Sequence, residues 1–327
     1  MRDFSYIRAT SASQARSAAQ QAGAMLLAGG TTLLDLAKCG VSEPETVIDI
    51  THLSGMSGIT VDTAGARIGA LARMSEVADH GDIRAAFPAV SQSLSLAASA
   101  QLRNMATIGG NLLQRTRCSY FRDPGAFPAC NKRNPGSGCA AIGGITRNHA
   151  VLGTSEACIA SYPGDLAVAL VAFDAVVELD GRNVAVDDFF LAPGNTPDSE
   201  TVLQRGEMIT AITIPASAAA VNSTYIKVRD RQSYEFAAAS AAVGLELEAD
   251  GKTVRDIRVA LGGVATKPWR ARSVEQALIG KALDADTVEK ASRLAMEGAV
   301  SHGGNHYKIE LAPRVVTRAI LKMGGLA

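Results

Sequence analysis

Residues 25–38 read MLLAGGTTLLDLAK. The apolar residues Met25 to Ala28 predict a short strand, and the residues that lead to Lys38 predict a helix. The glycine pair Gly29-Gly30 joins the two. Glycine lets a backbone approach a phosphate closely, and the N–H groups that begin a helix face negative charge. The segment is therefore a candidate phosphate-binding loop, although a single glycine pair is more often only a turn.

A second glycine pair lies in residues 101–112, QLRNMATIGGNL. Thr107 to Asn111 offers similar chemistry, with free N–H groups, a hydroxyl and an amide. Two such loops in the first third of the chain make a phosphate-bearing ligand a better hypothesis than either loop alone. A third motif, Gly136 to Ala141, matches G-x-G-x-x-A but follows Asn134-Pro135 instead of a strand. We therefore reject it as a dinucleotide fingerprint.

Four of the five cysteines lie in one turn-rich stretch, at Cys118, Cys130, Cys139 and Cys158. Residues 115–149 hold six basic side chains and one acid, whereas the whole chain is balanced at 32 against 32. Four thiolates in a basic loop suit a cubane iron–sulfur cluster, because the cluster is negative and nearby cations stabilise it and tune its potential.

Zinc, disulfides and plain buried thiols stay open at this point as alternatives to the cluster. Structural zinc sites usually show short Cys-x2–4-Cys pairs, whereas the gaps here are eleven, eight and eighteen residues. A chain of 327 residues with 47% hydrophobic content does not need disulfides to hold a core. The fifth cysteine, Cys39, follows a periodic apolar run and is expected to be a helix or core thiol.

Composition excludes several classes of function. Zero net charge and a pI near 7.0 argue against a nucleic-acid or polybasic membrane surface. The most apolar run, residues 166–179, is too short to span a bilayer. The first residues contain no apolar core of a signal peptide, so the chain is expected to stay cytoplasmic or to reach the periplasm by export with a partner subunit.

The remaining pattern mixes strands and helices without regular alternation, which is typical of the α+β class. A helix is expected from Thr10 or Ser11 to Gly23, and a helix or strand from Asp165 to Phe173. Residues 215–222 are expected to form a linker. Further strands are expected at 46–50, 67–71, 175–179, 209–214, 225–228, 238–248 and 254–261, and further helices at 87–99, 273–279, 284–298 and 314–323.

Three motifs in this order resemble the FAD-binding (medium) subunits of the molybdenum hydroxylases, the xanthine dehydrogenase family. They are residues 26–34, residues 103–112 and Gly164-Asp165-Leu166-Ala167. The resemblance runs nearly from end to end. Most members pass directly from the second motif to the third, whereas this chain inserts about forty residues there. The cysteine-bearing insertion is similar to that of the subgroup with a [4Fe-4S] cluster in the flavin subunit, such as the bacterial periplasmic aldehyde oxidoreductase.

The resemblance implies a two-part FAD-binding domain of the PCMH (vanillyl-alcohol-oxidase) type over 1–215. Its parts would be 1–55 and 56–215, the second with a [4Fe-4S] insertion over about 115–158. A C-terminal α+β domain over 220–327 would be like that of the carbon monoxide dehydrogenase flavoprotein.

Site residues follow from the motif match. The FAD pyrophosphate would be wrapped by Leu26, Leu27, Ala28, Gly29, Gly30, Thr31, Thr32, Leu33 and Leu34. The second loop would add contacts from Thr107, Gly110 and Asn111. Asp165 would bind the ribose or adenine end, and Lys227 would lie near the isoalloxazine. The cluster ligands would be Cys118, Cys130, Cys139 and Cys158.

The function implied is electron transfer within a heterotrimeric aldehyde oxidoreductase or related enzyme. Electrons from a molybdopterin-binding large subunit would pass through a [2Fe-2S] small subunit to FAD, which reduces an external acceptor. Such a subunit needs no acid–base pair, and the five histidines are scattered. One alternative is a self-sufficient flavin oxidase or reductase of the same fold, and another is a zinc-stabilised binding module.

Overall fold

A three-stranded parallel sheet opens the chain in the computed structural model, which describes residues 1–326. Its order is β1-β3-β2. Ser11 caps the first helix by accepting a hydrogen bond from the Gln14 N–H, as its side chain predicts. Strand β1 was not expected from the pattern, because three of its four residues are exposed. The elements are β1 (Ser5–Arg8), α1 (Ala12–Ala19), β2 (Ala24–Leu27), α2 (Leu33–Lys38) and β3 (Thr46–Asp49).

A five-stranded antiparallel sheet follows in the order β4-β5-β8-β6-β7. Helix α9 resolves the ambiguous run after Asp165, and all of its residues are buried because it packs between helix α5 and the C-terminal sheet. The strands are β4 (Ile59–Asp62), β5 (Gly65–Gly69), β6 (Val176–Leu179), β7 (Arg182–Ala185) and β8 (Ile209–Pro215). The helices are α3 (Met74–Asp79), α4 (Gly81–Ala86), α5 (Pro88–Ser95), α6 (Ala100–Arg103), α7 (Ile108–Leu112), α9 (Leu166–Ala172) and α10 (Val186–Phe189).

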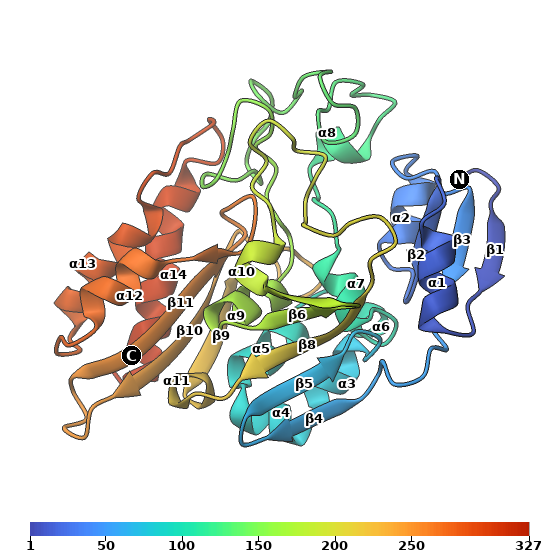
Figure 1. Cartoon of the computed structure of the whole chain (residues 1–327). Helices are drawn as coiled ribbons and strands as arrows, with labels where there is room; N and C mark the ends of the chain where they lie inside the picture. The colour runs from blue at the N-terminus through green and yellow to red at the C-terminus, as the bar shows by residue number, and fades with distance from the viewer. Residues whose placement is uncertain (327) are drawn as a thin grey trace.

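The C-terminal part builds a four-stranded antiparallel sheet in the order β12-β11-β10-β9, covered by helices (Figure 1). The last helix begins seven residues before the expected Arg314 and contains Pro313. The expected linker holds a short helix, α11 (Ala218–Val221). The other elements are β9 (Ser223–Val228), β10 (Ala239–Leu247), β11 (Val254–Gly262), β12 (Trp269–Arg270), α12 (Arg272–Leu278), α13 (Ala285–Arg293), η1 (Leu294–Met296) and α14 (Tyr307–Met323). The predicted α+β class is confirmed.

One continuous core joins the first two sheets to the C-terminal part. It contains Ile48 from the first sheet, Ile212 from the second, and Tyr225 and Ala242 from the third. A second core lies under the C-terminal helices. Shared burial of this kind holds the sheets in one arrangement, so residues from all three can form common pockets. Within residues 1–326, no helix has the length and apolar character that crossing a membrane requires.

The cysteine-bearing segment stands apart from the sheets, at the top of Figure 1 in green. Between residues 115 and 158 its only helix is α8 (Ser119–Arg122). The rest consists of turns and single bridges, which agrees with its glycine and proline content. The rejected motif lies in these turns, where Gly136 and Gly138 have φ of +83° and +96°. A dinucleotide site would require a strand before it, and the structure has none within 115–158.

Candidate functional site

The two glycine loops pack directly against each other. A Cβ atom on Gly29 would lie 2.0 Å from the Met105 carbonyl oxygen, just before the second loop. Gly30 has φ +71°, a conformation that side-chain-bearing residues rarely adopt. Only glycine therefore fits either position. Both loops line one pocket of about 460 Å³, to which Gly29, Gly30, Thr31, Thr32, Leu33, Thr107, Gly109 and Gly110 contribute.

The backbone N–H groups of the first loop remain available. Within residues 1–326 those of residues 29–32 donate no hydrogen bond. The second loop differs from expectation, because its N–H groups are already in use. Ile108 and Gly109 donate to the Ala72 and Ala70 carbonyls at 2.9 and 2.8 Å, and Gly110 donates to the Thr107 hydroxyl at 3.3 Å. The expectation of free donors there was wrong, because Thr107 caps helix α7 and the loop is stitched to the end of β5.

The expected pyrophosphate residues do not all reach the pocket. Leu26 and Ala28 line it, as does the run from Gly29 to Leu33. Leu27 and Leu34 do not line any pocket described in residues 1–326. The alternation of a strand explains Leu27, because neighbouring side chains point to opposite faces.

A second pocket of about 260 Å³ adjoins the first through Thr31, Thr32 and Gly110. Its walls bring together parts of the chain that are far apart in sequence. They include Asn111, Asp165, Arg117 and the aromatic side chains of Tyr234 and Phe236, from the loop that joins β9 to β10.

Asp165 and Lys227 form one buried ion pair beside this second pocket. The Nζ–Oδ2 distance is 2.8 Å, and the side chains are 5% and 1% exposed. Tyr225 donates to the other carboxylate oxygen at 2.7 Å. Burial raises the pKa of Asp165, and the Lys227 ammonium opposes this rise. The expectation that the two residues serve opposite ends of an extended FAD is incompatible with this pair.

The cysteine segment folds so that three of its cysteines come together. Cys130 and Cys139 face each other in an isolated antiparallel bridge. Asn131 then ties this bridge to the strand-like turn before Cys158, since it accepts from the Gly138 N–H at 2.8 Å and donates to the Ala157 carbonyl at 3.0 Å. Cys118 packs with Cys130 around the buried Phe121 ring. Cys39 lies elsewhere, at the C-terminal end of α2.

All five cysteines are free thiols in the structure, so no disulfide links them. Burial raises the pKa of Cys118 to about 12, and the nearby Cys158 and Cys130 thiols add to the rise. Burial also raises the pKa of Cys158, against the effect of the Lys132 ammonium. The His149 Nε2 lies 3.2 Å from the Cys118 sulfur. No group of three or more Cys, His, Asp or Glu side chains in residues 1–326 is arranged to hold a single metal ion.

Two basic residues next to Cys130 have structural partners. Arg133 donates to the Tyr120 and Phe121 carbonyls at 2.5 and 2.6 Å, and also to those of Phe127 and Pro128. Its fork therefore holds the turn between Cys118 and Cys130. This arrangement argues against the simple expectation that these charges only tune a potential.

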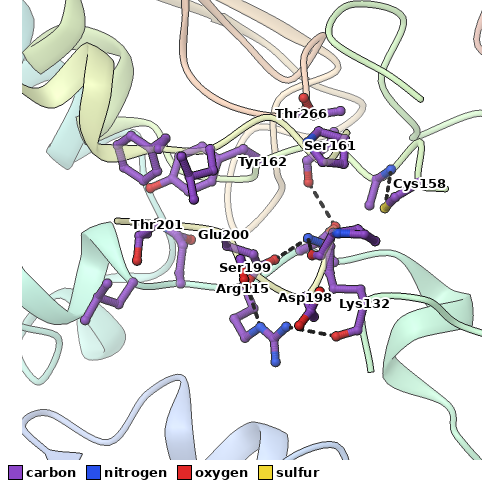
Figure 2. A pocket seen from close by; sticks show the side chains of 18 of the residues that line it. Arg115, Lys132, Cys158, Ser161, Tyr162, Asp198, Ser199, Glu200, Thr201 and Thr266 are labelled. Atoms are coloured by element: carbon purple, nitrogen blue, oxygen red, sulfur yellow. Dashed lines mark hydrogen bonds and ion pairs between the residues drawn. The ribbon is translucent and has the colours of Figure 1, made fainter. Parts of the chain in front are cut away.

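Lys132 belongs to a charged network that the sequence did not reveal (Figure 2). Glu200 accepts from Arg115 Nε at 2.5 Å and lies 2.6 Å from Lys132 Nζ, so one carboxylate joins two cations. The three residues line a polar pocket of about 350 Å³ that also reaches Cys158. Arg115 and Glu200 are 85 positions apart, and no local pattern announces such a contact.

Comparison with known proteins agrees with this geometry. A family described as the FAD binding domain in molybdopterin dehydrogenase matches residues 2–217, and one described as the CO dehydrogenase flavoprotein C-terminal domain matches residues 223–323. The chain is 47% identical to the aldehyde oxidoreductase FAD-binding subunit of Escherichia coli K12, over 85% of this chain and 86% of that protein. It is 28% identical to the carbon monoxide dehydrogenase medium chain of Hydrogenophaga pseudoflava, over 91% and 88%.

Solved structures show the same fold. A carbon monoxide dehydrogenase from Hydrogenophaga pseudoflava that lacks the Mo-pyranopterin moiety aligns with a TM-score of 0.76 at 25% identity, over 100% of this chain and 99% of that one. Quinoline 2-oxidoreductase from Pseudomonas putida 86 aligns with a TM-score of 0.74 at 22% identity, over 99% and 98%. With two glycine loops facing one pocket and both family models matched in order, the chain belongs to the FAD-binding subunits of the molybdenum hydroxylases.

Proposed function

We propose that the two adjoining pockets hold one FAD and that the first glycine loop binds its pyrophosphate. The observation that carries this proposal is the unused row of N–H groups at residues 29–32, which line the junction of the pockets. Buried N–H groups normally find a partner, and phosphate oxygens supply one. Thr107, Gly110 and Asn111 complete the opposite wall, Thr107 and Gly110 along the first pocket and Gly110 and Asn111 along the second.

We assign the isoalloxazine to the second pocket. Tyr234 and Phe236 offer aromatic faces there, whereas no aromatic residue lines the first pocket. Asp165 lines the second pocket, and Lys227 is paired with it, so both belong to the ring end in this assignment. The first pocket then takes the adenine end. Domain boundaries of 1–215 and 220–327 are consistent with the two family matches.

Cys118, Cys130, Cys139 and Cys158 are proposed to hold a [4Fe-4S] cluster. The donor set fits, because four free thiols converge on one segment and a cubane takes four thiolates. A zinc ion needs its sulfurs about 2.3 Å from one point, whereas a cubane binds each thiolate at a separate iron and therefore accepts a wider set. The absence of a single-ion arrangement in residues 1–326 is compatible with the cubane. Metal binding would displace the thiol protons that burial favours.

The subunit is proposed to transfer electrons in a heterotrimer with a molybdopterin-binding large subunit and a [2Fe-2S] small subunit. FAD, when bound, supplies the change between two-electron and one-electron chemistry, and the protein places and tunes it. The alternative is a self-sufficient flavoenzyme of the same fold. The similarity to an aldehyde oxidoreductase subunit at 47% identity favours the electron-transfer role, with an aldehyde as the substrate of the whole enzyme.

The visible spectrum of the purified full chain tests these assignments. Flavin bands with a broad brown absorbance would support both cofactors, and flavin bands alone after anaerobic purification would remove the cluster from the proposal. The isolated chain should pass electrons from reduced flavin to an artificial acceptor without oxidising aldehydes. Co-expression with the two proposed partner subunits should restore aldehyde turnover. Robust aldehyde oxidation by the isolated, molybdenum-free chain would favour the self-sufficient flavoenzyme.

A further inference from the structure

Arg117 lies between the proposed flavin pocket and the cysteine segment. It directly precedes Cys118 in the chain. Its side chain lines the 260 Å³ pocket together with Asn111 and Asp165. It also lines a smaller pocket of about 150 Å³, whose wall includes Cys118 and His149. One side chain therefore borders both places where we put a redox cofactor.

The Arg117 side chain is fixed by contacts from two other parts of the fold. Its Nη1 donates to Asp35 of helix α2 at 3.0 Å. Its guanidinium stacks on the Phe236 ring, with 4.8 Å between the central carbon and the ring centroid. Asp35 belongs to the N-terminal sheet unit and Phe236 to the C-terminal part. Such a clamp fixes the position of a long side chain that would otherwise be free to move.

Two buried polar atoms of this pocket's lining residues have no hydrogen-bond partner. They are the Nε of Arg117, which is a donor, and the Oδ1 of Asn111, which is an acceptor. Buried polar groups without partners are rare in folded proteins and call for an explanation. A ligand with an alternating acceptor and donor edge would satisfy both atoms. The pyrimidine edge of an isoalloxazine, with its carbonyls and N–H group, is such an edge.

We propose that Arg117 contacts the flavin ring, donating a hydrogen bond to its pyrimidine edge and favouring the reduced flavin through its positive charge. This inference rests on the proposed FAD site, and it adds a residue of the cysteine insertion to that site. Two-electron reduction gives the flavin a negative charge near neutral pH, so a cation held in the low dielectric of the pocket stabilises the reduced form more than the oxidised form.

The flavin midpoint potential of the full chain tests the proposal, with Arg117→Gln and Arg117→Lys as variants. Arg122→Gln is the matched control, because Arg122 also pairs with Asp35 but lines none of the pockets. Arg117→Gln should shift the two-electron equilibrium at least tenfold toward oxidised flavin, a potential about 30 mV lower. Arg117→Lys and Arg122→Gln should stay within threefold of wild type.

Each outcome separates this inference from the FAD site itself. If the wild-type chain holds no flavin, the proposed function fails. If wild type holds flavin and Arg117→Gln leaves its potential unchanged, only this inference fails. Equal shifts in Arg117→Gln and Arg122→Gln would also overturn it, since loosening of the Asp35 contacts would then be the cause. If Arg117→Gln cannot retain flavin, Arg117→Lys decides, because a tenfold shift in that variant contradicts the role of charge.

Discussion

The Lys227 ammonium lies 2.8 Å from the Asp165 carboxylate in the interior of the protein. Lys227 also donates to the Leu96 carbonyl at 3.1 Å, and Tyr225 supports the carboxylate from the other side. The pair joins strand β9 of the C-terminal sheet to the start of helix α9. One contact thus fixes the C-terminal sheet against the part of the chain that carries the glycine loops, beside the proposed ring pocket.

Removal of either partner should therefore destabilise the fold. Lys227→Met or Asp165→Asn should each lower the free energy of unfolding by about 3–5 kcal/mol, because the remaining polar group is buried without its partner. Urea denaturation measures the effect. Arg293→Gln, which breaks an exposed pair with Glu289, should cost about 0.5 kcal/mol or less. Equal effects in the buried and exposed pairs would contradict this account.

Gly29→Ala should empty the FAD site. The new Cβ would stand 2.0 Å from the Met105 carbonyl oxygen, so the two glycine loops must separate. Overpacking of this kind costs about 1–3 kcal/mol. Flavin content per chain is the measurement, with a drop of more than tenfold expected. Gly81→Ala is the control, because a Cβ there meets no atom within 4 Å. Full flavin occupancy in Gly29→Ala would show that the loops do not need this contact.

Serine at Cys118, Cys130, Cys139 or Cys158 should abolish or distort the cluster, whereas Cys39→Ser should keep it. Cys39 ends helix α2 and belongs to none of the contacts among the other four. Iron and acid-labile sulfide should each amount to about four per chain in wild type and in Cys39→Ser. Zinc in place of iron after anaerobic purification would refute the assignment.

Arg133 should act through its hydrogen bonds more than through its charge. Both Arg133→Lys and Arg133→Gln should loosen the cysteine segment, because neither reproduces the fork that binds the carbonyls around Phe121 and Phe127. Each lost bond to a charged donor is worth about 1.5–3 kcal/mol. Iron retention on heating reports the effect. Arg147→Gln, in the same segment but exposed and paired with Asp230, should behave like wild type. Rescue by lysine would favour a purely electrostatic role.

Lys308 should make stability depend on alkaline pH. Its side chain is 1% exposed and donates to the Gly263 carbonyl, and burial lowers its pKa from 10.5 to about 8. Between these values the unfolded chain binds more protons than the folded one, so stability rises with pH. Relative to Lys308→Met, wild type should gain roughly 3 kcal/mol between pH 8 and 10.5, from a shift of 10.5 to about 8 at 1.36 kcal/mol per unit.

Denaturation curves of wild type and Lys308→Met at several pH values provide the test. The difference between the two proteins isolates Lys308 from the tyrosines and thiols that titrate in the same range. Below pH 8 the difference should be constant, because Lys308 is then charged in both folded and unfolded chains. A difference that stays flat up to pH 10.5 would show that the buried amine keeps an ordinary pKa.

Local features of the fold were predictable from the sequence. The strand before Gly29, the helix cap at Ser11 and the hairpin turn at Gly251, which has φ +66°, each depend on residues close together in the chain. Strand β1 escaped because its side chains are largely exposed, so no apolar pattern marks it. The length of α14 escaped because a proline within it favours an interruption that the packing of its neighbours overrides.

The sequence by itself determined which residue types stand ready: two glycine loops, four clustered cysteines and one acidic motif at Asp165. Backbone freedom and thiol chemistry belong to single residues, so they can be read without a fold. The tertiary structure alone decided the partners: Asp165 with Lys227, Glu200 with Arg115 and Lys132, and Arg117 with Asp35 and Phe236. These contacts join residues from different sheets and segments, and they exist only because a common core holds the sheets together.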